Sequence, residues 1–324
     1  MRPTHSARTG MALILTLAAI VLGGALALLM QARGARVAQA EQAELIQERL
    51  RIAAAEAARD ALWVLAADDN LSVDHAGEDW AQPREHTFPD GLATWAVVED
   101  AGRFFNWNNL AAAQQPGRTS RDICGDLLTF CGDFQALPIV AALSDYVDSD
   151  DTGDYEEKFY RHATPPLQPP NRELWAPGEL LNVHGFTARF LRPRPKADSS
   201  DMFSGDIATA AVVVPVALTQ PIPINLNTAS REVLMALAGL QHEDAVRSVL
   251  ALRMVQPFES LGALLMAHPE LAAKLGDSVR VNSVYFRVRA RAALGDQFST
   301  VLAWVERDSH SGDIRILQWV PEVG

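Results

Sequence analysis

Hydrophobic residues are most concentrated near the N-terminus, where the twenty residues from Met11 to Met30 carry no charge. Twenty residues of α-helix extend about 30 Å, which matches the hydrocarbon core of a bilayer. Arg2 and Arg8 precede this run, and positively charged flanks stay on the cytoplasmic side of a membrane. The pattern predicts a membrane-spanning helix, with the rest of the chain exported.

A helical pattern continues beyond the apolar run as far as Asp68. Residues 31–68 are rich in Ala, Glu, Gln and Arg, which are strong helix formers, and they contain no proline. Apolar residues recur in this segment at roughly helical spacing, namely Leu45, Leu50, Ile52, Leu62, Val64 and Leu65. We expect one helix of more than about fifty residues that ends near Asp68–Asn70, with its second half packed on a globular domain.

Downstream, the patterns predict both strands and helices. Thr94–Val98 and Gly102–Phe105 flank the turn signal Asp100–Gly102, so they predict two neighbouring strands. The segment 111–190 contains helical patterns, loops and a proline-rich stretch. Further expected elements are a polar linker at 194–206, a strand at Thr209–Val216, helices from Thr228 to about Gly276, and strands near Val279–Ala292 and Val301–Arg307.

An acidic segment lies within the expected helical and loop region. Seven carboxylates fall within thirteen residues, namely Asp145, Asp148, Asp150, Asp151, Asp154, Glu156 and Glu157. They repel one another unless water or a cation separates them, and hard oxygen ligands of this kind suit Ca²⁺. Residues 148–154 partly match an EF-hand loop with glycine at the sixth position, but Phe159 occupies the twelfth, where an EF-hand needs Glu. A loop that binds Ca²⁺ and a solvated charge run are therefore both open interpretations.

The chain has two cysteines, Cys124 and Cys131, both in the part expected to be exported. In an oxidising compartment they can close a small disulfide loop, and two buried thiols are the alternative. Their spacing, without a neighbouring His or Cys pair, is a poor zinc pattern. The sequence therefore gives one disulfide candidate and no zinc site.

Charge and motif content weigh against two other functional classes. The net charge is −12 at pH 7, which repels nucleic acid phosphates. Residues 224–262 are similar to a helix-hairpin-helix unit, but Glu243 and Asp244 follow its turn, so packing is favoured over phosphate binding. The unit offers one alternative function, a membrane-anchored periplasmic DNA-binding or uptake protein. No catalytic motif names a residue for an anchored enzyme, so a non-enzymatic protein is favoured.

The N-terminal leader resembles that of type IV prepilins, which a dedicated peptidase cuts after a glycine. The polar leader ends at Gly10 and the apolar run begins at Met11, so the resemblance implies cleavage between them. Most such proteins carry Glu at the fifth mature position, where this chain has Leu15. An ordinary signal anchor and a secretory signal cut after Ala40 are the alternatives.

A wider set of motifs resembles the minor pseudopilin K family of type II secretion over nearly the whole chain. The matching segments, in chain order, are the leader 8–14, Glu99–Leu110, Leu143–Asp150, Gly178–Gly185, Asn225–Ser230 and Val281–Val288. The resemblance implies an α+β, pilin-like fold, in which a long N-terminal transmembrane helix packs on an antiparallel sheet and a large α-helical domain is inserted. The implied domains are a leader at 1–10, a transmembrane segment at 11–30, a periplasmic helix and first strands at 31–110, an inserted helical domain with the acidic loop at 111–205, its helix-hairpin-helix-like part at 206–276, and closing strands at 277–324.

The same resemblance implies a place at the tip of a periplasmic pseudopilus that exports folded proteins across the outer membrane. It implies an inner-membrane protein with one span, its C-terminal bulk in the periplasm, processed by the prepilin peptidase. The implied partners are minor pseudopilins I and J, then H, and the major pseudopilin, with secreted cargo or the outer-membrane secretin as further contacts and no nucleic acid. The implied Ca²⁺ ligands are Asp148, Asp150 and Asp154, with Asp151, Glu156 and Glu157 as weaker candidates.

Leu15 favours the tip position. In a pilus-like bundle the usual carboxylate neutralises the N-terminal amine of a neighbouring subunit, and an unpaired buried charge costs several kcal/mol. A subunit without that carboxylate cannot pair with an earlier subunit, but it can start the stack. If the segment is only an anchor, Leu15 is simply one more residue that faces lipid.

Overall fold

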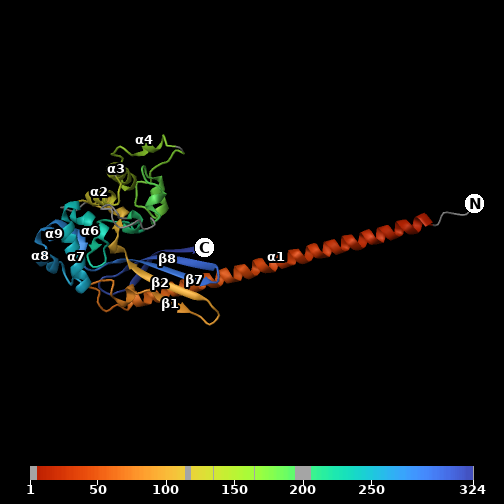
Figure 1. Ribbon diagram of the computed structural model, residues 1–324. Coiled ribbons are helices and arrows are strands. Elements are labelled where there is room, and N and C mark those ends of the chain that lie inside the picture. The colour runs from red at the N-terminus through yellow and green to blue at the C-terminus, as the bar shows by residue number, and fades with distance from the viewer. Residues whose placement is uncertain (1–5, 114–117, 134, 164, 194–205, 324) are drawn as a thin grey trace, which may run out of the picture.

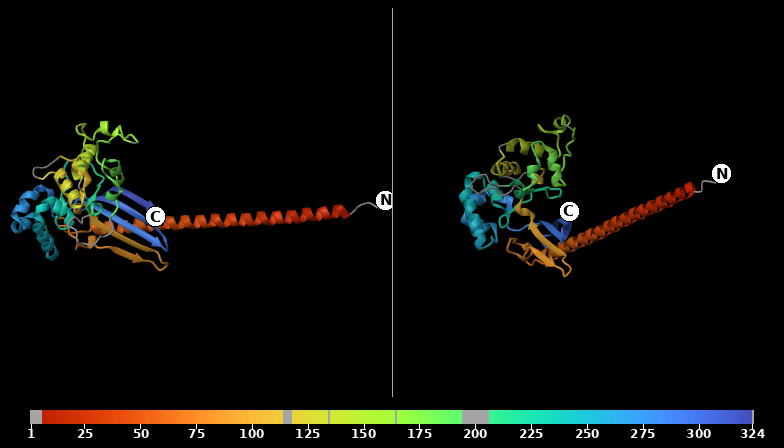
Figure 2. Two further views of the ribbon diagram at one scale, coloured as in Figure 1. Left: turned by 45° about the horizontal axis from the view of Figure 1, so that its top comes forward. Right: turned by 45° about the vertical axis from the view of Figure 1, so that its right-hand side comes forward.

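The computed structural model describes residues 6–113, 118–133, 135–163, 165–193 and 206–323 (Figure 1). Helix α1 (Ser6–Ala66) is continuous over 61 residues, so the single long helix expected from the sequence is confirmed. Its first half projects away from the globular part of the chain in both views of Figure 2. Within the described residues, α1 is the one helix long and apolar enough to cross a membrane. Residues 1–5 of the expected leader and most of the expected linker at 194–206 lie outside the described residues.

The second half of α1 packs against the sheet through a narrow stripe. Five of its residues are at most 1% exposed: Leu50, Ala54, Ala58, Ala61 and Leu65. Their spacing of three or four residues places them on one face of the helix, and the small alanines let the helix approach the strands closely. The predicted stripe was wrong at two positions, because Leu45 and Ile52 are 72% and 55% exposed.

The sheet has five antiparallel strands in the order β1-β2-β7-β8-β9. Their bounds are β1 Arg84–Thr87, β2 Ala93–Asp100, β7 Tyr285–Leu294, β8 Gln297–Arg307 and β9 Ile314–Val323. Alternate residues of β7 are buried against α1, as the period of two in a strand requires. Strand β9 was not expected from the sequence. It contains Pro321, which a strand tolerates at the edge of a sheet, where β9 lies.

The chain leaves the sheet after β2 and returns to it at β7. The expected second strand at Gly102–Phe105 does not pair with β2, so that prediction was wrong. The Asp100 carboxylate accepts a hydrogen bond from the Gly102 backbone N–H at 2.6 Å and caps a short 3-10 helix, Ala101–Arg103. This cap turns the chain out of the sheet and opens the inserted region, residues 101–284.

Strand pairing inside the inserted region is short. Phe105–Asn106 (β3) pairs in parallel with Ala211–Val212 (β4). The strand expected at Thr209–Val216 is limited to these two residues of β4, because Ile207–Ala210 forms the short helix α5. Ile224–Asn225 (β5) likewise pairs in parallel with Val279–Arg280 (β6).

Helices make up most of the regular structure in the inserted region, as expected. The longer helices are α2 (Ser120–Phe130), α3 (Ala136–Val147), α6 (Arg231–Ala238) and α7 (Glu243–Val255), and the shorter ones are α4 (Glu157–Tyr160), α8 (Leu261–Ala267) and α9 (Pro269–Leu275). One hydrophobic core joins α2, α3 and α6, and it is separate from the core between α1 and the sheet. Figure 1 shows these helices at the end of the molecule remote from the N-terminus of α1.

Asparagine side chains tie distant segments of the inserted region together. In each case the side-chain amide donates to a backbone carbonyl and accepts from the backbone N–H of the same residue, at 2.8–3.1 Å. The pairs are Asn108 with Leu174, Asn109 with Ile222, and Asn227 with Phe258. All three asparagines are buried, and such two-way pairing satisfies backbone groups that no strand serves.

Candidate metal centre in the inserted region

The C-terminal end of α3 carries the first acidic residues of the candidate site. Apolar residues of α3, including Ile139 and Leu143, are buried and anchor the helix. Asp145 lies in the last turn, and Asp148 is the C-cap residue. The C-terminus of a helix carries a partial negative charge, which disfavours carboxylates and favours cations. The helix therefore positions two acids where a positive partner is needed.

The loop after α3 brings three carboxylates together, which we call the loop cluster: Asp148, Asp150 and Glu156. Each offers one oxygen, and these oxygens all lie within 4.8 Å of one another. Two ligands about 2.4 Å from a Ca²⁺ ion can be up to about 4.8 Å apart, so the three oxygens fit one coordination sphere. Glu156 is 5% exposed, whereas Asp150 is exposed. The cluster thus has a buried inner side and an outer side open to water.

Gly153 and Asp145 close the loop beside the cluster. Asp145 accepts a hydrogen bond from the Tyr155 backbone N–H at 2.9 Å. A Cβ atom at Gly153 would overlap the Asp145 carboxylate. The glycine at the sixth position of the EF-hand-like segment is therefore required for close approach of the chain to Asp145.

Three buried carboxylate oxygens of the loop cluster lack a hydrogen-bond donor among the described residues. Asp148 Oδ1 and both carboxylate oxygens of Glu156 are buried, and none of the described residues donates a hydrogen bond to them. Burial, helped by Asp145 and Asp148, raises the pKa of Glu156 to about 7. Burial and the neighbouring Asp150 raise the pKa of Asp148 to about 6. Buried acceptors without donors are costly, and a bound cation would satisfy them.

A single arginine approaches the loop cluster among the described residues. Arg121 lies 3.7 Å from Asp148, and its side chain is 55% exposed. An ion pair this exposed and this long contributes little. It leaves the negative charge of Glu156 without compensation.

The other predicted ligands do not belong to the group of three whose oxygens lie within 4.8 Å of one another. Asp151, Asp154 and Glu157 are exposed, and Glu157 forms an ion pair with Arg161 at 2.8 Å. Asp154 was expected among the best ligands, but the oxygens that meet Asp148 and Asp150 come from Glu156. The donor set of three carboxylates fits a hard divalent cation such as Ca²⁺.

A second acidic cluster, which the sequence analysis missed, lies at the end of α1 and encloses an arginine. This Arg307 cluster contains Asp68, Asp74 and Glu78, whose oxygens also lie within 4.8 Å of one another. Arg307 is 1% exposed and contacts Asp68 at 2.7 Å and Asp74 at 2.5 Å. Burial raises the pKa of Asp74 to about 7, although the guanidinium of Arg307 opposes the shift. The arginine takes the place that a metal ion would need.

The predicted disulfide between Cys124 and Cys131 is not formed in the structure. Cys124 lies within α2, and Cys131 caps the C-terminus of the same helix. Seven residues of helix advance by about 10 Å, whereas a disulfide requires Cα atoms within about 7 Å. Both side chains are buried, and burial strongly raises the pKa of the Cys124 thiol. The arrangement corresponds to the alternative of two buried thiols.

The helix-hairpin-helix-like unit serves packing. Residues Val233–Ala238 of α6 are all buried, and Gly239 makes the turn at φ 89°. The acid that follows, Glu243, forms ion pairs with Arg231 and Arg247. These arginines are thus engaged by a carboxylate, which disfavours the alternative of phosphate binding.

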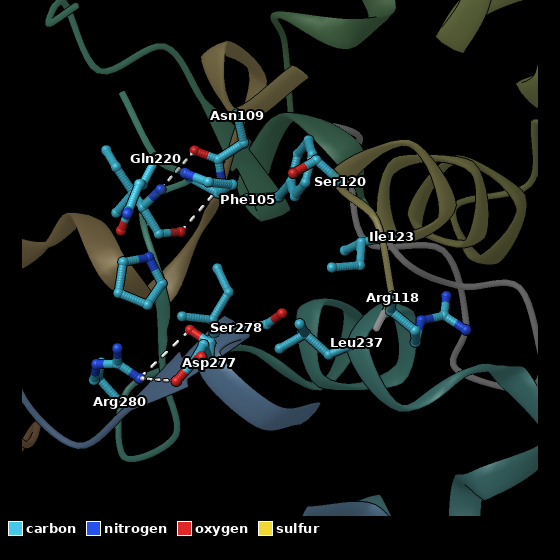
Figure 3. Close-up of a pocket in the computed structure, with 14 residues that line it drawn as sticks. Phe105, Asn109, Arg118, Ser120, Ile123, Gln220, Leu237, Asp277, Ser278 and Arg280 are labelled. Atoms are coloured by element: carbon cyan, nitrogen blue, oxygen red, sulfur yellow. Dashed lines mark hydrogen bonds and ion pairs between the residues drawn. The ribbon is translucent and has the colours of Figure 1, made fainter. Parts of the chain in front are cut away.

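A cavity of about 390 Å³ lies between α2, residues 220–224 and β6 (Figure 3). Arg118 and Arg280 line opposite sides of it. Arg118 pairs with Asp126, and Arg280 pairs with Asp277 at 3.8 Å. The cavity is polar at its edges, but its charges are compensated within the chain.

Comparison with known proteins agrees with this architecture. Two family models for protein K of the type II secretion system match residues 103–193 and residues 224–285. Type II secretion system protein K of Pseudomonas aeruginosa is 27% identical over 255 residues, which are 76% of this chain and 70% of that protein.

A solved structure confirms the predicted α+β, pilin-like fold. A chain of the GspK–GspI–GspJ complex from the type 2 secretion system of enterotoxigenic Escherichia coli matches with a TM-score of 0.66 and 18% identity. The match covers 89% of this chain and 99% of that chain. The two family models, the relative and the solved structure therefore all point to the protein K family of the type II secretion system and support a minor pseudopilin.

Proposed function

We propose that this minor pseudopilin occupies the tip of a periplasmic pseudopilus and initiates or caps its assembly. The observation that carries the proposal is the uncovered N-terminal half of α1. Leu13, Leu15 and Leu29 are 71%, 66% and 67% exposed, and the globular part of the chain buries none of the most apolar stretch. Lipid and the helices of neighbouring subunits are the natural partners of such a surface.

Leu15 supports the tip in preference to a position along the shaft. A shaft subunit needs a carboxylate within the apolar bundle to neutralise the N-terminal amine of its neighbour, because an uncompensated buried charge is costly. The uncharged Leu15 cannot serve an amine in this way. The first subunit of a stack has no such amine to serve.

The position of the inserted region also supports the tip. It lies at the end of the molecule remote from the free half of α1 (Figure 1). If α1 packs in the bundle, this bulk projects away from the membrane. A subunit added above it would collide with the inserted helices, so the region acts as a cap and is placed to meet secreted cargo or the outer-membrane secretin.

The partners proposed for this chain follow from the solved neighbour, in which GspK is in complex with GspI and GspJ. We extend that arrangement to minor pseudopilins I and J directly beneath this chain, followed by H and the major pseudopilin. The stripe of α1 that does not face the sheet, including Leu45 and Ile52, is exposed and available for these contacts. The assembly would couple the inner membrane to export of folded proteins.

Membrane insertion and processing complete the proposal. The chain is held in the inner membrane by one span, with its C-terminal bulk in the periplasm. The prepilin peptidase cuts between Gly10 and Met11, which lie near the start of α1. Cleavage would leave the amine of Met11 at the start of the apolar helix.

We also propose that the loop cluster binds Ca²⁺. Asp148, Asp150 and Glu156 would supply ligands, and Asp145 would hold the loop through Tyr155. The ion would supply the positive charge that three neighbouring carboxylates require. Its role is structural, because it joins the end of α3 to the segment before α4.

Co-purification tests the tip assignment. The full chain carrying a C-terminal tag is co-expressed with minor pseudopilins I and J and purified from detergent extracts of membranes. We expect I and J to co-purify in near-equal amounts, and recovery of neither would refute the assignment.

Leu15→Glu should lower secretion by the assembled system several-fold, whereas secretion with the uncharged control Leu15→Met should equal that with the unmodified chain.

A further inference from the structure

A cleft of about 730 Å³ lies where the sheet meets the helical hairpin. Its walls come from residues 75–81, from β2 with the turn that follows it, and from the C-terminal end of α7. None of the residues that line the cleft belongs to the loop cluster or to the Arg307 cluster. Glu78 lies within the segment 75–81 but does not line the cleft. The cleft is therefore a separate feature with its own chemistry.

Two arginines line the cleft without a carboxylate partner. Neither Arg103 nor Arg253 forms an ion pair with any described residue. The Nε atom of Arg103 is buried without an acceptor, and its guanidinium lies 5.1 Å from the ring centroid of Phe104. Arg253 donates a hydrogen bond to the Leu226 carbonyl at 2.7 Å. Burial lowers the pKa of Arg253, and repulsion from Arg103 lowers it further, so the two charges face a common space.

The acids that line the same cleft are already compensated. Glu99 forms ion pairs with Arg287 and Arg289, both at 2.9 Å. Asp100 is buried and accepts hydrogen bonds from the Gly102 N–H, the Asn225 amide and the Thr228 hydroxyl. These internal contacts use the carboxylates, so the charge left over in the cleft is positive.

The rim beside Arg253 is apolar and uncovered. Met254 and Val255, at the end of α7, are 84% and 89% exposed, and both line the cleft. Trp80 and Trp95 also line the cleft. A polypeptide can cover the exposed apolar side chains and also pair with the arginines that lack a carboxylate partner. A small inorganic anion would leave the apolar rim in water.

We propose that this cleft binds an acidic segment of a partner polypeptide, with carboxylates on Arg103 and Arg253 and apolar side chains on Met254 and Val255. Guanidinium groups pair with carboxylates through two parallel hydrogen bonds, which gives both energy and orientation. Binding would relieve the repulsion between the two arginines and cover the rim. The inference stands on the cleft alone and does not depend on the tip assignment.

Selection from a displayed library of random twelve-residue peptides tests the inference on the full chain in detergent micelles. Peptides enriched on the unmodified chain should carry Asp or Glu beside aliphatic residues. Their synthetic forms should bind at least ten-fold more weakly to the Arg103→Gln, Arg253→Gln double variant. Arg291→Gln, which changes an exposed arginine outside the cleft, should bind them unchanged.

A rim variant makes the test independent of any effect of the arginines on folding. Val255→Glu alters a side chain that is 89% exposed, so the fold is retained, and repulsion should weaken binding of the acidic peptides several-fold. Enrichment of peptides without acids, or no enrichment at all, would overturn the inference. It would also be overturned if the selected peptides bound both the double variant and Val255→Glu as tightly as the unmodified chain.

Discussion

The loop cluster and the Arg307 cluster pose the same electrostatic problem and differ in the source of their positive charge. Each brings three carboxylate oxygens within 4.8 Å of one another. In the Arg307 cluster, a guanidinium that is 1% exposed contacts two of the acids. In the loop cluster, the buried oxygens of Asp148 and Glu156 meet no donor from the described residues.

The two clusters therefore differ in how they depend on the solution around the protein. The Arg307 cluster joins the end of α1 to β8, and its positive charge comes from the chain itself. The loop cluster lies in an inserted segment with little sheet structure, and we propose that a cation from solution balances its charge. Carboxylates at this spacing are costly when left alone and stabilising when they share a divalent ion.

Removal of the internal cation should give the largest effect. Arg307→Met leaves Asp74 buried without its partner, and breaking such a pair costs about 3–5 kcal/mol of unfolding free energy. Chemical denaturation of the full chain in micelles measures it. Arg315→Met is the control, because it removes an ion pair whose arginine is 69% exposed, and it should cost less than about 1 kcal/mol. Equal losses in the two variants would remove the distinction between the clusters.

Removal of the external cation should give the next largest effect. If Ca²⁺ occupies the loop cluster at 100 times its Kd, its removal by EGTA lowers the unfolding free energy by about 2.7 kcal/mol. Thermal unfolding with and without EGTA measures the loss. Glu156→Gln should abolish the response to EGTA, whereas Glu157→Gln, one residue away and exposed, should keep it. A melting temperature that ignores millimolar Ca²⁺ would refute the site.

In EGTA, the stability of the protein should depend on pH in the direction set by the raised pKa of Glu156. The pKa of Glu156 is raised from its ordinary value of 4.5 to about 7 in the folded chain. The folded state therefore binds the proton more tightly, and stability in EGTA should rise as the pH falls from about 8 to about 5. Glu156→Gln should flatten this rise. A fall in stability over the same range in EGTA would contradict the charge balance described for the loop cluster.

The smallest expected change in unfolding free energy, that of Asp148→Asn, distinguishes the two clusters by its sign. Asp148→Asn in EGTA removes one of several like charges, so it should raise the unfolding free energy by up to about 1 kcal/mol. Asp74→Asn removes a charge that Arg307 needs, so it should lower stability with or without Ca²⁺. Changes in unfolding free energy of opposite sign in the two variants would confirm the difference between the clusters, and changes of the same sign would contradict it.

Local patterns predicted the parts of the fold that depend on local physics. The uncharged run from Met11 and the helix formers after it were sufficient for α1. The predicted stripe included Leu50 and Leu65, which are buried, but it missed the alanines that share their face, such as Ala54 and Ala58, because close packing against the sheet favours small residues. The exit of the chain at Asp100 depends on a side-chain cap and on burial in the inserted region, and neither leaves a signal in hydrophobic periodicity.

The candidate site was only partly predictable for the same reason. The density of acids indicated a cation, but the choice between Asp154 and Glu156 depends on how the loop folds back over Asp145. The Arg307 cluster joins residues 239 positions apart, so no spacing in the sequence announces it. The asparagine pairings, such as that of Asn108 with Leu174, emerge only from the packed structure.

Calorimetric titration with CaCl₂ of the full chain, after removal of bound Ca²⁺, tests most directly whether the inserted region takes its positive charge from solution. The account predicts saturable binding in the unmodified chain, its loss in Glu156→Gln, and its retention in Glu157→Gln. Absence of binding in the unmodified chain, or equal binding in all three proteins, would contradict it.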